Sequence, residues 1–188
     1  MRHHIILVLI GFYSLIAIPA IGAELTLKKE EPNRQYEVRT GVLLHDVNGL
    51  WSRSRKEGGI DFNAEIVFVK PSLDFSSGTI HPNFGLSINN QGDTSNLYLG
   101  FFWERKTTSG IFLDLGVGAA VHNGELEATN PDKKGLGSRV LFRIPIEIGY
   151  LFDKHHRFSL IFVHLSNAYL AYPNEGLDVL GLRYGYSF

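Results

Sequence analysis

The sequence has no cysteine among its 188 residues, so the fold does not rely on disulfide bonds. The formal net charge of −1 provides no overall basic field of the kind that nucleic-acid-binding proteins use. The eight histidines are scattered, without the paired spacing of zinc ligands. Glycine-rich phosphate loops and nucleotide-binding motifs are also absent from the sequence. These absences exclude several common binding chemistries.

The sequence has only one long apolar run, and it lies at the N-terminus. Arg2 gives a positive start, residues 5–18 are almost all apolar, and small residues follow. This order predicts a cleaved secretory signal peptide over residues 1–23, with cleavage after Gly22 or Ala23. A retained membrane anchor is the alternative, but the run is shorter than the roughly 20 residues that a spanning helix needs.

Beyond a charged tail over residues 24–34, apolar and polar residues alternate in segments separated by turn residues. Alternation with a period of two is typical of β-strands that have one apolar face. In the segment 139–150, for example, Arg143 and Glu147 lie opposite an apolar row. The length of the chain indicates one domain. Eight such segments are predicted: 36–44, 60–70, 79–88, 97–105, 111–121, 139–150, 157–167 and 177–188.

A soluble β-sandwich and a membrane β-barrel both explain this alternation. Spanning strands need about 9–11 residues, whereas soluble strands more often have about 5–6. The last four segments reach the spanning length, and long and short connections partly alternate, as in outer-membrane barrels. The last segment ends in the aromatic residue Phe188, which resembles the C-terminal signature of bacterial outer-membrane proteins. We therefore predict an all-β fold, an eight-stranded antiparallel transmembrane β-barrel over residues 35–188.

One constellation of polar residues near the C-terminus can carry chemistry. His164 and Ser166 are two residues apart and share one face of a strand, and Asp178 follows twelve residues after the serine, across a hairpin. A histidine can activate a serine hydroxyl, and a carboxylate can orient the histidine. Asn167 could donate to an oxyanion, and Asn174 could brace the hairpin or orient Asp178. Strand parity places the histidine, the serine and the aspartate on the apolar, lipid-facing side of the barrel.

Each of these residues also has a simpler explanation. A histidine and a serine at this spacing are common as polar rim residues, Asn167 is typical of a strand end, and Asp178 of a solvated strand start. The segment 51–56 is basic and could meet lipid phosphates, or it could be a solvated loop. For His45 and Asp46, a loop or interior pair is favoured over a catalytic role.

The motif HLSNA at 164–168, followed by PNEG at 173–176 and the acid at Asp178, resembles the PagL family of lipid A 3-O-deacylases. This resemblance implies an eight-stranded outer-membrane barrel that hydrolyses the ester-linked acyl chain at the 3-position of lipid A. It also implies the site residues, with no metal or cofactor: Ser166 as nucleophile, His164 as base, Asp178 as acid, Asn167 in the oxyanion hole and Asn174 in support.

The chain departs from this family pattern at two positions. The family acid is usually glutamate, so Asp178 has a shorter reach to the histidine. The family often has glycine where this chain has Tyr169, at a position whose backbone N–H helps to bind the oxyanion. The second oxyanion donor is therefore left open by the sequence.

The sequence therefore predicts a serine esterase of the bacterial outer membrane. Its expected partners are lipid A of lipopolysaccharide and the lipids of the outer membrane, without nucleic acid. Whether the barrel forms a homodimer stays open. Two alternatives remain: a structural or adhesive barrel without enzymatic activity, and an esterase that acts on phospholipid.

Overall fold

The structure, a computed structural model, describes residues 34–188 except residues 53 and 71. The predicted signal peptide over 1–23, and the charged tail apart from Arg34, lie outside the described residues. In the described part of the chain, no helix is long and apolar enough to cross a membrane.

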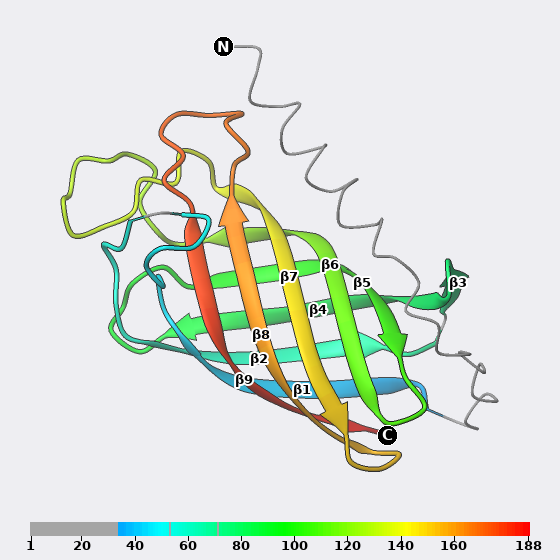
Figure 1. The fold of residues 1–188 in the computed structure, drawn as a ribbon. Helices are drawn as coiled ribbons and strands as arrows, with labels where there is room; N and C mark the ends of the chain where they lie inside the picture. The colour runs from blue at the N-terminus through cyan, green and yellow to red at the C-terminus, as the bar shows by residue number, and fades with distance from the viewer. Residues whose placement is uncertain (1–33, 53, 71) are drawn as a thin grey trace.

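The described residues form one antiparallel sheet that closes on itself (Figure 1). Its strands follow the order β2-β1-β9-β8-β7-β6-β5-β4, and a further pairing of β2 with β4 closes a barrel of eight strands. A ninth, short strand, β3, extends β4 beyond the barrel. The strands are β1 Tyr36–Leu44, β2 Ile60–Phe68, β3 Leu73–Phe75, β4 Gly78–Asn89, β5 Asn96–Lys106, β6 Ile111–His122, β7 Val140–Leu151, β8 His156–Ser166 and β9 Leu177–Ser187.

The eight barrel strands agree with the eight predicted segments to within two residues at each end, and the predicted barrel is confirmed. The short strand β3 is not among the predicted segments and lies in the connection between β2 and β4. Here β4 continues past the end of its pairing with β2, at Val67 opposite Asn83. The chain folds back so that Leu73 pairs with Ile80 and supplies hydrogen-bond partners to this free stretch of β4.

The distribution of side chains is the reverse of that in a soluble protein. Large apolar side chains such as Phe62, Leu99 and Ile148 lie exposed on the outside of the barrel, whereas arginines and carboxylates are buried inside it. Contiguous apolar surface of this kind is rare on soluble monomers and is the lipid-facing band of a membrane barrel.

The buried charges inside the barrel form ion pairs. Arg39 on β1 contacts Glu37 at 2.5 Å, Asp114 at 2.8 Å and Glu147 at 3.0 Å. Arg157 on β8 contacts the same Glu37 at 2.9 Å, and the other interior arginines likewise face carboxylates. Buried charges are tolerated when they are paired in this way, and the network lines the barrel interior with polar side chains from several strands.

The two ends of the barrel differ. At the end that we call the loop end, the connections are residues 45–59, 90–95, 123–139 and 167–176 (Figure 1). At the opposite turn end, residues 107–110 and 152–155 form tight turns, and the C-terminus lies nearby. The turn end also carries ring contacts between neighbouring aromatic side chains, consistent with the interfacial girdle of membrane proteins. These contacts are Tyr36 with Phe188, Tyr186 with Phe188, Phe158 with Tyr184 and Tyr150 with Phe152.

Candidate active site at the loop end

The side chains of His164, Ser166 and Asp178 meet where β8 and β9 reach the loop end. His164 follows Phe158, Leu160 and Phe162 on the outward row of β8, because residues two apart share a strand face. In the antiparallel pairing of the two strands, His164 lies directly opposite Asp178.

The three side chains form a continuous chain of contacts. His164 Nδ1 lies 2.6 Å from Oδ1 of Asp178, and His164 Nε2 lies 3.0 Å from Oγ of Ser166. Because an ionised carboxylate can only accept, Nδ1 carries the ring proton and Nε2 is free to accept one from the serine hydroxyl. The aspartate reaches the ring despite its short side chain because the strand register sets it opposite His164. Its side chain is fully buried, whereas the histidine side chain keeps 13% of its surface exposed.

Asn167 and Asn174 hold the 167–176 connection in shape. The side-chain NH₂ of Asn167 donates to the carbonyl oxygens of Leu136 and Pro173, both at 2.9 Å. Its backbone N–H donates to Oδ1 of Asn174 at 2.9 Å. Asn167 therefore binds neighbouring backbone with the donors that were expected to face an oxyanion. Neither asparagine binds the carboxylate of Asp178, whose partners are His164 and a residue of another connection.

That other partner comes from the 45–59 connection, which the sequence indicated only as a basic or solvated loop. The backbone N–H of Ser52 donates to Oδ2 of Asp178 at 2.7 Å, and the N–H of Val47 donates to the backbone carbonyl of Asp178 at 2.8 Å. The indole ring of Trp51 packs edge to face against His164, with ring centroids 5.0 Å apart. No periodic pattern in the sequence marks these contacts.

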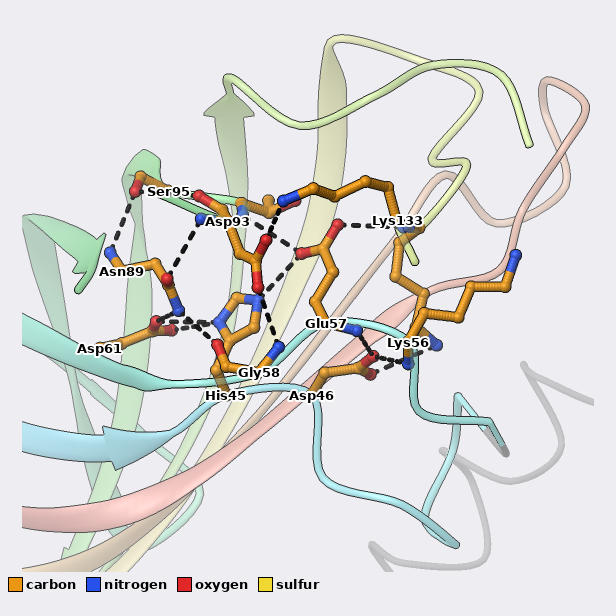
Figure 2. Close-up of polar contacts among 12 residues, drawn as sticks. His45, Asp46, Lys56, Glu57, Gly58, Asp61, Asn89, Asp93, Ser95 and Lys133 are labelled. Atoms are coloured by element: carbon orange, nitrogen blue, oxygen red, sulfur yellow. Dashed lines mark hydrogen bonds and ion pairs between the residues drawn. The ribbon is translucent and has the colours of Figure 1, made fainter. Parts of the chain in front are cut away.

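The 45–59 connection is itself fixed by a buried polar cluster, which we call the loop clamp: His45, Asp46, Glu57 and Lys134. The His45 ring lies between two carboxylates, with Nδ1 2.8 Å from Asp61 and Nε2 2.9 Å from Glu57 (Figure 2). Glu57 also accepts the backbone N–H of Lys134 at 2.9 Å, and the ammonium of that lysine lies 3.3 Å from Asp46. The clamp thus joins the 45–59 and 123–139 connections, in agreement with the structural role favoured for His45 and Asp46.

The loop clamp changes the acidity of its members. Burial opposes a charge on His45, but hydrogen bonds to Asp61 and Glu57 outweigh it and raise the pKa of His45 to about 9. Burial likewise favours neutral Glu57, but hydrogen bonds from His45 and from backbone N–H groups lower its pKa to about 2. Charged His45 therefore stabilises the folded clamp fully below its ordinary pKa of 6.5, and this contribution is lost as the pH rises through about 9. The contribution of Glu57 is complete above 4.5 and is lost as the pH falls through about 2.

The ring of His45 should titrate near pH 9 in the folded protein and at a lower pH in Glu57→Gln, which loses one of the two carboxylates. NMR of the ring Cε1–H groups in detergent micelles can follow this, with His45→Gln to assign the signal. Titration of the wild-type ring near 6.5 would contradict the proposed charge state.

Further contacts tie the remaining connections to this end. Lys56 pairs with Glu175 at 2.7 Å, and the other carboxylate oxygen of Glu175 accepts the backbone N–H of Gly135 at 2.7 Å. Gly137 has φ +68, and a Cβ there would lie 2.0 Å from the carbonyl oxygen of Pro173, so only glycine allows this close approach. The 45–59, 123–139 and 167–176 connections therefore form one packed layer around the site. Within the described residues, no group of three or more His, Cys, Asp or Glu side chains could hold a metal ion.

A closed eight-stranded barrel with an apolar outside and a charged inside defines the class of the protein: it is a β-barrel protein of the outer membrane. More specifically, residues 21–187 match the family model described as "Lipid A 3-O-deacylase (PagL)", and the chain belongs to the PagL family. This family assignment confirms the resemblance inferred from the sequence motif and identifies a family of hydrolases.

Two individual proteins illustrate the similarity. The lipid A deacylase PagL of Bordetella bronchiseptica is 35% identical over 78 residues, which span 42% of this chain and 42% of that protein's length. The crystal structure of the outer membrane enzyme PagL superimposes with a TM-score of 0.57 at 21% sequence identity. That comparison covers 80% of this chain and 97% of the crystallised chain, and it supports the barrel fold.

Proposed function

We propose that this protein is a serine esterase that removes the ester-linked 3-O-acyl chain from lipid A. The observation that carries the proposal is the chain of contacts from Asp178 through His164 to Ser166 on the outward face of β8 and β9, in a member of the PagL family. Polar, ionisable groups on a lipid-facing surface are energetically costly, and where they occur they usually serve a function. A lipid ester in the outer leaflet is the substrate that this position suits, with the loop end facing outward from the cell.

In the proposed reaction, His164 Nε2 takes the proton of the Ser166 hydroxyl as Oγ attacks the ester carbonyl. The tetrahedral intermediate then collapses, and the sugar 3-hydroxyl leaves with the proton from His164. Water attacks the acyl-enzyme with His164 again as base, and the second tetrahedral intermediate expels Ser166 Oγ, which regains its proton from His164 as the fatty acid is released. Asp178 keeps the proton on Nδ1 and stabilises the imidazolium that forms in each half-reaction.

We propose that the oxyanion is bound by the backbone N–H of Tyr169 and the side-chain NH₂ of Asn174, with Asn167 as the brace. Tyr169 has φ 61, the left-handed conformation that favours glycine, and it stands where the family often has glycine. The backbone at position 169 is therefore in the left-handed conformation that a glycine would adopt, although the residue is a tyrosine. The NH₂ of Asn167 is engaged with two carbonyl groups, whereas Asn174 uses only its oxygen to accept from Asn167.

Mass spectrometry of lipid A from cells that express the wild-type protein or Ser166→Ala tests this function. We expect lipid A to lose one acyl chain with the wild type and to stay unmodified with the variant. The purified wild type should also release fatty acid from lipopolysaccharide but not from phospholipid vesicles. Unchanged lipid A in the presence of folded, membrane-inserted wild type would refute the proposal and favour a barrel without enzymatic activity. Release from phospholipid alone would favour the other esterase.

A further inference from the structure

The 45–59 connection contacts both the acid and the base of the proposed triad. The Ser52 N–H donates to Oδ2 of Asp178 at 2.7 Å, and Oδ1 of the same carboxylate lies 2.6 Å from His164. Each carboxylate oxygen thus has one strong partner, and the carboxylate cannot rotate without breaking one of the two contacts. Hydrogen bonds to ionised groups are about twice as strong as those between neutral groups.

The side chain of Trp51 packs against His164, the proposed base. Its ring stands edge to face against His164, with centroids 5.0 Å apart and planes at 76°, and against Phe162 at 5.4 Å and 88°. Half of the indole surface remains exposed, so the ring lies at the boundary between the site and its surroundings. Because the indole is itself held against Phe162, its contact with His164 restricts the rotation of the imidazole.

The positions of Trp51 and Ser52 are fixed by contacts within the protein. Asp46 accepts the backbone N–H groups of Lys56 at 2.7 Å and Glu57 at 3.0 Å, which closes the connection on itself (Figure 2). The Val47 N–H bound to the Asp178 carbonyl fixes the start of the same connection on β9. The segment around Trp51 is therefore held from both ends by contacts that need no bound lipid.

We propose that Ser52, through its backbone N–H, and Trp51 are positioning residues that orient the His164–Asp178 pair, so that these two residues of the 45–59 connection belong to the active site. This rests on the proposed function for its physiological reaction. The positioning itself can be measured without lipid A, through the reactivity of Ser166.

A fluorophosphonate probe provides that measurement. Ser166 Oγ attacks phosphorus, the P–F bond breaks, fluoride leaves, and the hydroxyl proton passes to His164 Nε2. Ser52→Pro removes the N–H donor, and we expect it to slow phosphonylation and kcat by about 10-fold to 100-fold, the range for losing a hydrogen bond to a charged group, with KM little changed. Ser52→Ala retains the donor and should lose far less than Ser52→Pro. The difference in phosphonylation rate and kcat between the two variants measures the contribution of the Ser52 N–H.

Trp51→Ala and Trp51→Phe test the indole contact in the same assay. We expect the alanine variant to lose kcat and phosphonylation rate by about 10-fold, and the phenylalanine variant, which retains a ring, to recover most of the loss. Leu50→Ala is the matched control, because Leu50 is an exposed apolar neighbour in the same connection, and it should behave as wild type.

Exchange of the Ser52 amide proton keeps the proposal testable if Ser52→Pro fails to fold. In the wild type, this proton should be protected from exchange by its contact with Asp178. Rapid exchange at Ser52, or wild-type phosphonylation rates in folded Ser52→Pro and Trp51→Ala, would overturn the proposal. If Ser166 is phosphonylated but lipid A is not deacylated, the proposed function fails, whereas the positioning role is still decided by the relative rates of the variants.

Discussion

Asp178→Asn should lower kcat for deacylation by about 10⁴-fold, as expected when the acid of a serine triad is replaced by its amide. The Ser52 N–H needs an acceptor, so the amide oxygen would turn toward it and the amide NH₂ toward His164 Nδ1. His164 would then accept at Nδ1 and carry its proton on Nε2, where it faces the Ser166 hydroxyl. In this tautomer the ring cannot take the serine proton, although the shape of the site is preserved.

Steady-state kinetics with lipopolysaccharide micelles can measure this loss, together with the migration of the folded barrel on gels of unheated samples. Asp132→Asn is a suitable control, because Asp132 is exposed in the 123–139 connection and should leave kcat unchanged. A folded Asp178→Asn protein with kcat within tenfold of wild type would show that the acid does not set the tautomer of His164.

Arg39→Met should destabilise the folded barrel by about 3–5 kcal/mol, the usual range for removing one partner of a buried ion pair. The Arg39 guanidinium lies against Glu37, Asp114 and Glu147 in the barrel interior. Without it, these buried carboxylates keep fewer positive partners. Methionine fills part of the volume but supplies no donor, so the loss falls on the electrostatics rather than on packing.

Urea-dependent folding into lipid vesicles, followed by tryptophan fluorescence, can measure this free energy of unfolding. The control is Arg105→Met, because Arg105 is exposed near the turn end of β5 and its replacement should change stability by less than about 1 kcal/mol. Equal stability of the two variants would mean that the interior ion pairs contribute little beyond their desolvation cost.

The sequence was sufficient to predict the barrel because its strands carry a strong periodic signal. In β7, Phe142 and Ile148 point outward while Arg143 and Glu147 are buried, as the alternation required. The same alternation accounts for the outward row on β8 that ends in His164 and Ser166. The contact of His164 with Asp178 could not be predicted from the alternation alone, because it depends on which residues face each other across β8 and β9. The hairpin sequence suggested this register but could not fix it.

The contacts made by the loop-end connections could not be predicted from the sequence. Ser52 and Asp178 are 126 residues apart, and their hydrogen bond depends on the closure of β1 against β9. Glu57 shows no special pattern, yet it contacts His45 and Lys134 because the 45–59 and 123–139 connections converge at one end of the barrel. Loops lack the periodicity that marks strands, so their partners are decided by tertiary packing. Strand β3 was not predicted for a related reason, because it forms only where β4 extends beyond its pairing with β2.

The outward position of Ser166 has a kinetic consequence. In the proposed reaction, the substrate would reach this hydroxyl, at the end of the lipid-facing row of β8, by lateral diffusion within one leaflet rather than by capture from bulk water. The effective substrate concentration is then a mole fraction in the membrane plane. Turnover should therefore follow surface dilution: adding inert lipid at a constant total amount of substrate should slow the reaction, whereas diluting the whole suspension with buffer should leave the rate per enzyme unchanged.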